Sequence, residues 1–575
     1  MAENGESDIT RSKWRLPVGV FFRDSRLVFK WDALGKEILG MALPAALAVA
    51  ADPIASLIDT AFIGHIGPVE LAAAGVAIAL FNQASRITIF PLVSITTSFV
   101  AEEDTVANMK MKAAQFENLE GDTLDELEKG AAKQVLEGLD KNSQAKTCEM
   151  KWLKGDDKLE NAKAGAAPPS DESLARKSES NSEEEKDASK DNNSKNLELV
   201  NNVNCSNKKK AEMNKGKRHI ASASTALIFG IILGVVQAIF LMFGAKTLLG
   251  IMGVKHNSPM LAPAEKYLVT RSFGAPAVLL TMAMQGIFRG FKDTTTPLYV
   301  IMFGYSLNVA LDPLLIFVCR MGIRGAAIAH VLSQYLMALI LFLILMRKVN
   351  LLPPSLKDLQ FGRFLKNGSF LLARVIAVTF CVTFAASLAA RLGATPMAAF
   401  QTCLQVWLTS SLLADGLAVA VQAILACAFT EKDYKKATAA ANRVLQMSFV
   451  LGLGLSLLVG VGLYFGAGIF SRDVHVLHLI RIGLPFVAAT QPINSLSFVF
   501  DGVNYGASDF VYAAYSLILV AIASIAALIF FSKSGGFVGI WTALTIYMAL
   551  RAFAGVWRMG TGTGPWRFLR VPFIA

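Results

Sequence analysis

Acidic and polar side chains interrupt three apolar stretches in the first half of the chain. Asp52 and Asp59 are seven residues apart, and Asn308 and Asp312 are four apart, so each pair shares one helix face. His330 lies in a third apolar stretch. A charged group at the centre of a bilayer costs about 2.5–3.5 kcal/mol on insertion scales, so each residue is a site candidate. Carboxylates, an amide and an imidazole could bind a proton or a sodium ion.

The limits of these stretches place three of the candidates at a similar depth. At a rise of 1.5 Å per residue, Asp59, Asp312 and His330 lie roughly 6–11 Å below the outer surface. Each residue alone could be hydrogen-bonded in a helix interface, but the matched depth favours one coupling-ion site. Asp52 ranks second, because its bond to Pro53 could simply open a bend.

A second group of polar residues could bind a substrate. Arginine binds carboxylate through two parallel hydrogen bonds, so buried arginines would suit an organic acid. An ion pair such as Arg86 with Asp52, or an Arg374 side chain that extends to the membrane surface, is the alternative. The substrate-binding candidates are Arg86, Arg374, Gln405, Trp407, Asp415 and Gln422.

Composition divides the chain into a membrane part and a charged insert. The 575 residues are 54% hydrophobic and 17% charged, whereas soluble proteins carry about 25% charged residues. Residues 102–218 hold 25 Asp and Glu and 21 Lys and Arg. The net charge of +11 does not indicate nucleic-acid binding, because excess Lys and Arg in a membrane protein marks cytoplasmic loops.

Twelve apolar runs are long enough to cross a bilayer, which needs about 20 residues. They are 37–63, 69–100, 220–248, 264–288, 297–319, 324–346, 368–391, 396–429, 444–470, 476–500, 510–531 and 537–557. The runs predict an all-α integral membrane protein. Lys and Arg gather in the N-terminal stretch and the even-numbered connections, which places both termini and the insert in the cytoplasm. The insert should be largely disordered, with some helical character over 107–138.

The two halves of the chain resemble each other. Residues 66–73 match 392–399 at an offset of 326, and 288–293 resemble 500–509 at an offset of 212. A parallel repeat is typical of transporters with a site between two bundles, and chance similarity is the alternative. The acid cluster is not repeated, so we expect the cation site in the first half alone. The positions that correspond to Asp59, Asn308 and Asp312 are Ala385, Val520 and Ser524.

Several runs resemble the MATE (multidrug and toxic compound extrusion) family, and more closely its plant citrate exporters, some of them aluminium-activated or iron-related. They are IDTAFIGHIG (58–67), GIFRGFKDTTTPL (286–298), NVALDPLLIF (308–317), GAAIAHVLSQY (325–335) and WLTSSLLADGLAVAVQAILA (407–426). The resemblance implies twelve transmembrane helices in two pseudo-symmetric six-helix lobes around a V-shaped central cavity. It also implies an alternating-access antiporter driven by H⁺ or Na⁺, whose helix 1 bends near Pro44 and Pro53.

The resemblance assigns the coupling ion to Asp59, Asn308 and Asp312. His330 stands where the prokaryotic branch has a threonine, which favours protons because imidazole titrates near neutral pH. We therefore expect export of citrate or a similar carboxylate in exchange for H⁺, possibly Na⁺, across the plasma membrane. The alternatives are a MATE-type exporter of organic cations or conjugated secondary metabolites, and a citrate-permeable anion channel.

The expected segments follow from the same runs. Residues 1–36 and 558–575 are cytoplasmic tails, 37–101 and 219–346 the first lobe, 102–218 the insert, 347–367 a linker and 368–557 the second lobe. The serine-rich stretch 170–194 could accept phosphates and bind a kinase or regulatory partner. No nucleophile–base pair, phosphate loop or metal-ligand spacing predicts an enzyme, a metal site or a cofactor, and the only other partner expected is the lipid bilayer.

Overall fold

The computed structural model describes residues 30–139, 220–252, 254, 257–349, 360–470 and 474–570. Residues Met1–Met111 with Lys217–Ala575 form one compact unit, and Lys112–Gly216 form another. Of the second unit the structure describes the helical residues up to Leu139. The rest of the predicted disordered insert, from residue 140 on, lies outside the described residues.

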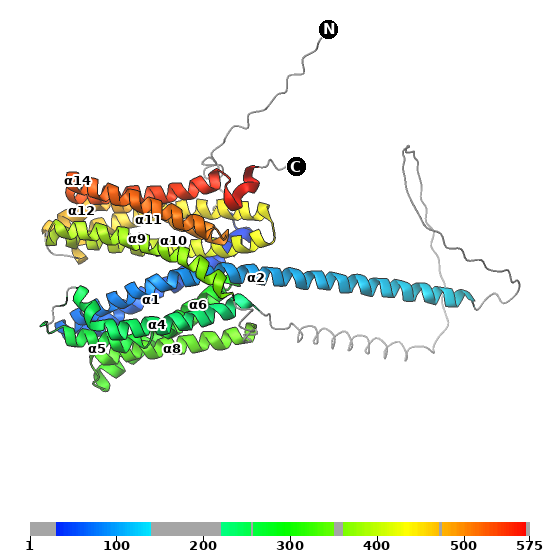
Figure 1. The fold of residues 1–575 in the computed structure, drawn as a ribbon, viewed down its shortest axis with the longest axis horizontal. Helices are drawn as coiled ribbons and strands as arrows, with labels where there is room; N and C mark the ends of the chain where they lie inside the picture. Colours follow the sequence, from blue (N-terminus) through cyan, green and yellow to red (C-terminus); the bar gives the residue numbers. More distant parts are fainter. Residues whose placement is uncertain are drawn as a thin grey trace, which may run out of the picture. The chain divides into compact units, whose positions relative to one another are not determined.

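The first half of the chain supplies one group of helices, which Figure 1 shows apart from those of the second half. They are α1 (Ala33–Gly64), α2 (Pro68–Leu139), α4 (Ala221–Ile251), α5 (Leu261–Ser272), α6 (Ala275–Gly290), α7 (Thr295–Pro313) and α8 (Ile323–Lys348). A π-helical turn, η3 (Leu314–Val318), extends α7.

The second half supplies the other group. Its elements are α9 (Phe361–Arg391), α10 (Ala394–Thr430), α11 (Tyr434–Phe470), α12 (Val474–Ala489), α13 (Gln491–Gly506), α14 (Phe510–Gly560) and the short η4 (Gly564–Arg570). The two halves are built alike. In each, the fourth span is a pair of helices bent at a short break, by 46° between α5 and α6 and by 48° between α12 and α13.

The described helices account for all twelve predicted spans. Nine are long and apolar enough to cross a membrane, and the two bent pairs raise the number to eleven. The 51 residues of α14 extend about 75 Å, more than twice the thickness of a hydrocarbon core. Its backbone leaves helical geometry at Gly536 (φ 52°, ψ −124°), so α14 contains two spans. The all-α architecture of two six-helix lobes is confirmed.

Small residues let the helices of each lobe approach closely. A Cβ on Gly290 of α6 would lie 2.8 Å from the Val100 side chain of α2. A Cβ on Gly506 of α13 would lie 2.7 Å from the backbone carbonyl oxygen of Gln422 on α10. Gly506 therefore occupies, in the packing of the second lobe, the position that Gly290 occupies in the first lobe. The sequence offset of 212 pairs Gly290 with Gly502 and is wrong by one helical turn. The cluster residues Asn308 and Asp312 then correspond to Ser524 and Leu528.

The end of the bundle where α1 begins and α2 enters the insert is called the insert end here. Connections at this end turn through a residue of positive φ followed by an aspartate, as in Lys292–Asp293 (φ 60° at Lys292). Asp293 accepts the backbone N–H of Thr296 and pairs with Lys348 at 2.5 Å. Burial opposes ionisation of Asp293, but these partners outweigh it and hold the pKa of its carboxyl below the ordinary value.

Hydrogen bonds between the lobes gather at the insert end. The Gln422 amide of α10 donates to the Ser94 carbonyl (2.7 Å) and to the Ser98 hydroxyl (3.0 Å) of α2. Ser98 in turn donates to the Tyr505 carbonyl of α13 at 2.8 Å. Nearby, Arg363 pairs with Glu102 at 2.5 Å. The lobes are therefore joined at this end, as a V-shaped central cavity requires.

Helix α1 contacts both lobes. At its insert end, Asp32 pairs with Arg443 of α11 at 2.7 Å, and Gly416 of α10 packs against Ala42 so tightly that a Cβ would lie 2.4 Å from its carbonyl oxygen. Further along, Asp52 accepts a hydrogen bond from Tyr305 of α7 at 2.7 Å. Pro44 and Pro53 of α1 lie where the helix passes from its contacts with the second lobe to its contacts with the first.

Candidate functional site

Three helices of the first lobe bring predicted cation-site residues together. Asp59 of α1 accepts a hydrogen bond from the Asn308 amide of α7 (3.2 Å) and lies 3.3 Å from Nδ1 of His330 on α8. Asp59 and His330 are each 4% exposed and Asn308 is fully buried. An amide and an imidazole both hold the Asp59 carboxylate in a site closed to water.

Asp312 completes this cluster from one turn beyond Asn308. Its side chain is fully buried and interacts directly with the carboxyl of Asp59. Among the described residues, no N–H or O–H group donates a hydrogen bond to either oxygen of Asp312. Two buried carboxylates in contact repel each other unless they share a proton or a cation. A proton on Asp312 would let it donate to Asp59, so the pair can hold and release one positive charge.

Polar groups on α8 orient the cluster. The Ser333 hydroxyl donates to the Asn308 side-chain oxygen at 3.4 Å, which turns the Asn308 amide nitrogen towards Asp59. Gln334 lies 3.3 Å from Nε2 of His330 and also interacts with the Tyr305 hydroxyl.

Asp52 is the exposed end of this polar chain. Its side chain is exposed and bonded to Tyr305, which interacts with Gln334. Asp52, Tyr305, Gln334, His330 and Asp59 thus form a continuous series of polar contacts from an exposed carboxylate to the buried one. Asp52 therefore lies at the edge of the cluster, and its second-rank role in binding the coupling ion stays a prediction.

Sequence reasoning did not single out Arg271 of α5, which lies beside the cluster. Arg271 is 6% exposed, its guanidinium lies over the Phe81 ring at 5.0 Å, and it interacts electrostatically with Asp59 and Asp312. The available signal was an arginine inside the predicted span 264–288, beyond the Glu265–Lys266 pair at its start. With both acids ionised the three groups carry one net negative charge, which one proton neutralises.

Arg86 of α2 and Gln405 of α10 have exposed side chains. Arg86 lies eleven residues, or three turns, before Thr97 and so on the same helix face. Thr97 donates to the Gly286 carbonyl of α6 at 3.2 Å within the first lobe. Ser94, one turn beyond Phe90, accepts the Gln422 amide of the second lobe. The exposed positions of α2 on this face carry mostly small or polar residues: Ala72, Gly75, Ala79, Gln83, Arg86 and Phe90. Gln83 and Arg86 are polar on this exposed stripe, which favours a position beside the space between the lobes over one that faces lipid.

The structure separates two other substrate candidates from that space. Trp407 is 1% exposed, and its indole N–H donates to Thr490 at 3.1 Å inside the second lobe. Gln422 is 6% exposed and forms the lobe junction described above. Both residues lie on α10, most of whose apolar stretch is buried.

A second charged cluster lies in the second lobe. Arg374 of α9 and Arg551 of α14 both bind the same oxygen of Asp501 on α13. The distance from Arg551 to this oxygen is 2.7 Å. Arg374 also donates to the Tyr505 hydroxyl. Asp415 of α10 is half-buried and interacts electrostatically with these groups. Arg289 of α6, in the first lobe, also interacts with Asp415. Arg374 and Asp415 were predicted from the sequence, whereas Arg551, within the predicted span 537–557, and Arg289, just beyond the span 264–288, were not singled out.

The sequence of this chain is similar to those of known proteins. Residues 213–314 and 371–550 match the family model described as MatE. Protein DETOXIFICATION 43 of Arabidopsis thaliana is 60% identical over 99% of this chain and 98% of its own length. Protein DETOXIFICATION 42 of the same plant is 55% identical over 99% of this chain and 100% of its own length.

The fold is also found in solved structures. The crystal structure of a MATE protein in the bent conformation superposes with a TM-score of 0.67, covering 93% of this chain and 96% of that one at 16% identity. The full-length similarity to plant DETOXIFICATION proteins, the family match and the two-lobe fold agree. The chain belongs to the MATE family of multi-pass membrane efflux transporters.

Proposed function

We propose that this transporter exports citrate, or a closely similar carboxylate, in exchange for protons by alternating access. In this proposal the protein lies in the plasma membrane, with its termini and the insert in the cytoplasm. The insert end then faces the cytoplasm, and the described state, joined at that end, is open towards the outside.

The excess of arginine around Asp415 carries the choice of an anionic substrate. Arg289, Arg374 and Arg551 stand against Asp415 and Asp501, which leaves one net positive charge. Exposed Arg86 adds another on the face that borders the interlobe space. A positive field attracts citrate and repels organic cations. An exporter of cationic drugs would need unpaired acids here, whereas two arginines bind Asp501.

The contact between Asp59 and Asp312 supports proton coupling. The pair can hold one proton, and the Asp52 series of polar contacts offers it a route to an exposed carboxylate. The cluster also contains the His330 imidazole. Sodium prefers oxygen ligands, so an imidazole favours a proton as the coupling ion. Arg271 supplies a fixed positive charge beside the acids and so competes with a bound metal cation.

Helix α1 can transmit the change of protonation to the lobes. Its far half holds Asp59, and its insert half packs against Gly416 of the other lobe. Protonation of Asp59 weakens its bonds to Asn308 and His330, and the prolines allow α1 to bend between its two contacts. Antiport requires that proton and citrate favour opposite states. Protons entering from outside therefore favour the inward-facing state, and citrate favours the return.

Flux through reconstituted protein tests the choice of substrate. Proteoliposomes are loaded with radiolabelled citrate or with a cationic dye, an inward pH gradient is imposed, and the voltage is clamped without sodium. Gradient-driven citrate efflux without dye efflux supports the proposal. Dye efflux alone would favour the cation exporter. Citrate flux that follows voltage and ignores the pH gradient would favour the anion channel.

A further inference from the structure

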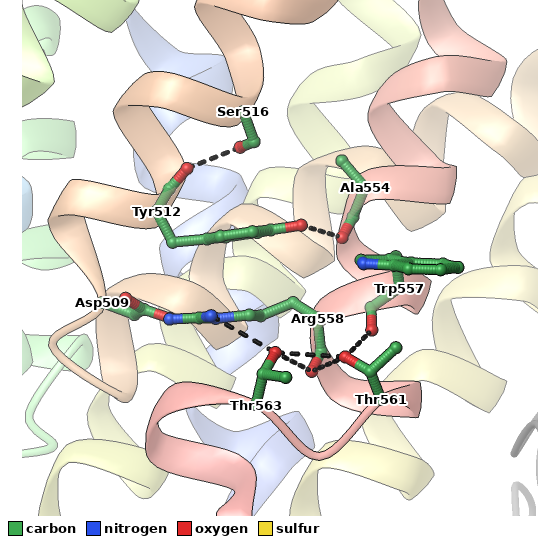
Figure 2. Close-up of polar contacts among 8 residues, drawn as sticks. All are labelled: Asp509, Tyr512, Ser516, Ala554, Trp557, Arg558, Thr561 and Thr563. Atoms are coloured by element: carbon green, nitrogen blue, oxygen red, sulfur yellow. Dashed lines mark hydrogen bonds and ion pairs between the residues drawn. The ribbon is translucent and has the colours of Figure 1, made fainter. Parts of the chain in front are cut away.

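Two arginines on one face of α14 differ in how their charge is balanced. Arg551 and Arg558 are seven residues, or about two turns, apart. Figure 2 shows Arg558 bound to the Asp509 carboxylate at 2.7 Å and to the Thr563 hydroxyl at 3.3 Å. Its guanidinium lies 4.4 Å from the centre of the Tyr512 ring. This site has one cation for one anion and is electrically neutral.

The Arg551 site has two cations for the one anion that they bind, because the nearby Asp415 is balanced by Arg289 of α6. Arg374 and Arg551 bind the same oxygen of Asp501, and each arginine is 8% exposed. Nε of Arg551 is buried with no hydrogen-bond partner among the described residues, and Nη1 reaches only the Met548 sulfur at 3.5 Å. Thioether sulfur is a weak acceptor, so Arg551 keeps unused donors and the cluster a net positive charge.

Arg374 and Arg551 line a small cavity between α9, α13 and α14. Its volume is about 20 Å³, and its wall includes Arg374, Asp501, Asn504, Ser516 and Arg551. One water molecule needs about 10–15 Å³ on the same measure. The cavity therefore holds a group the size of chloride or of one carboxylate, and whole citrate is too large. Asn504 and Ser516 add a neutral amide and a hydroxyl that can donate to an anion.

We propose that this second-lobe cavity binds one small anionic group, supplied by chloride or by one carboxylate arm of the transported anion. The anion neutralises the surplus charge that Arg374 and Arg551 share and accepts hydrogen bonds that Asp501 leaves unused. The carboxylate source rests on the proposed citrate transport, and the chloride source does not.

Binding of radioactive chloride to the purified full-length protein tests this inference. The protein is held in lipid nanodiscs with methanesulfonate as the bulk anion, and formate serves as a probe with a single carboxylate. The expected result is saturable binding of one chloride per chain, displaced by formate. Absence of saturable binding of both probes would overturn the proposal, and this measurement needs no variant.

Variants locate the site. Ser516→Asp places a negative charge in the cavity wall and should weaken chloride binding at least tenfold, as should Arg551→Gln. The matched control Arg558→Gln removes an arginine of the same helix face from its neutral pair and should leave chloride affinity within twofold. Equal chloride affinity in the wild type, Ser516→Asp and Arg551→Gln would contradict the assignment.

Citrate competition identifies the source of the anion. Displacement of chloride by citrate would assign the cavity to a substrate carboxylate, and retention of chloride in saturating citrate would assign it to a separate ion. A failed citrate flux assay with chloride binding intact would refute the proposed substrate alone. Citrate flux without binding of either probe would refute the anion site alone.

Discussion

Replacing Gln422 by methionine should shift the equilibrium between the two states of the transporter. Its amide donates two hydrogen bonds across the lobe junction, at 2.7 Å and 3.0 Å. Each is worth about 1 kcal/mol net, so the joined state loses about 2 kcal/mol. Both bonds must break when the lobes part at the insert end. The loss therefore falls on one state, and the population ratio should move about 30-fold towards the insert-open state.

Electron–electron distance measurements can follow this shift. Spin labels are placed on exposed Arg347 of α8 and Ala439 of α11, near the insert end of each lobe, after replacement of the native cysteines. Gln422→Met should add or enlarge a long-distance population, because the lobes separate there. Gln401→Met makes the same change at an exposed position of α10 and serves as the control. Identical distance distributions for Gln422→Met and the wild type would refute the proposed role of these bonds.

Three further predictions concern packing, electrostatics and substrate. Gly506→Val should lower the free energy of unfolding by about 1–3 kcal/mol, measured by thermal melting, because a Cβ there would lie 2.7 Å from the backbone carbonyl oxygen of Gln422. Asp293→Asn should cost about 1 kcal/mol at pH 7. The pKa of Asp293 is lowered in the fold, so its contribution is present above the unfolded-state pKa of about 3.9 and lost as the pH falls through the folded value. The difference in melting temperature between wild type and Asp293→Asn should therefore be smaller at pH 3 than at pH 7. Arg86→Gln should raise the KM for citrate about tenfold, the cost of roughly one hydrogen bond to a charged group, and leave the melting temperature unchanged.

The helices and the acid cluster were predictable because they depend on local pattern. Apolar runs define spans by length, and residue counts within a span fix depth, so Asp59, Asp312 and His330 could be placed at one level before any packing was known. Their convergence in space required the fold. The one-turn error in the second repeat offset arose because a short match of apolar sequence does not fix register, whereas the close glycine contacts do.

The substrate side was harder to predict for a physical reason. Helix α10 is apolar on nearly every face, so periodicity cannot tell which side meets the other lobe, and Trp407 and Gln422 could not be separated from exposed Gln405. The partners of the buried arginines come from helices far apart in the chain. Arg551 binds Asp501 across two spans, and no spacing in the sequence reveals that Arg374 shares the same oxygen.

Uphill movement of citrate tests the central claim of proton-coupled export most directly. Proteoliposomes with equal citrate concentrations on both sides receive an acidic exterior, with the voltage clamped and sodium absent, and the internal radiolabelled citrate is followed. The wild type should lose internal citrate against the concentration gradient that develops. Asp59→Asn should abolish this uphill loss while still exchanging labelled for unlabelled citrate. Uphill loss that persists in Asp59→Asn would contradict the account.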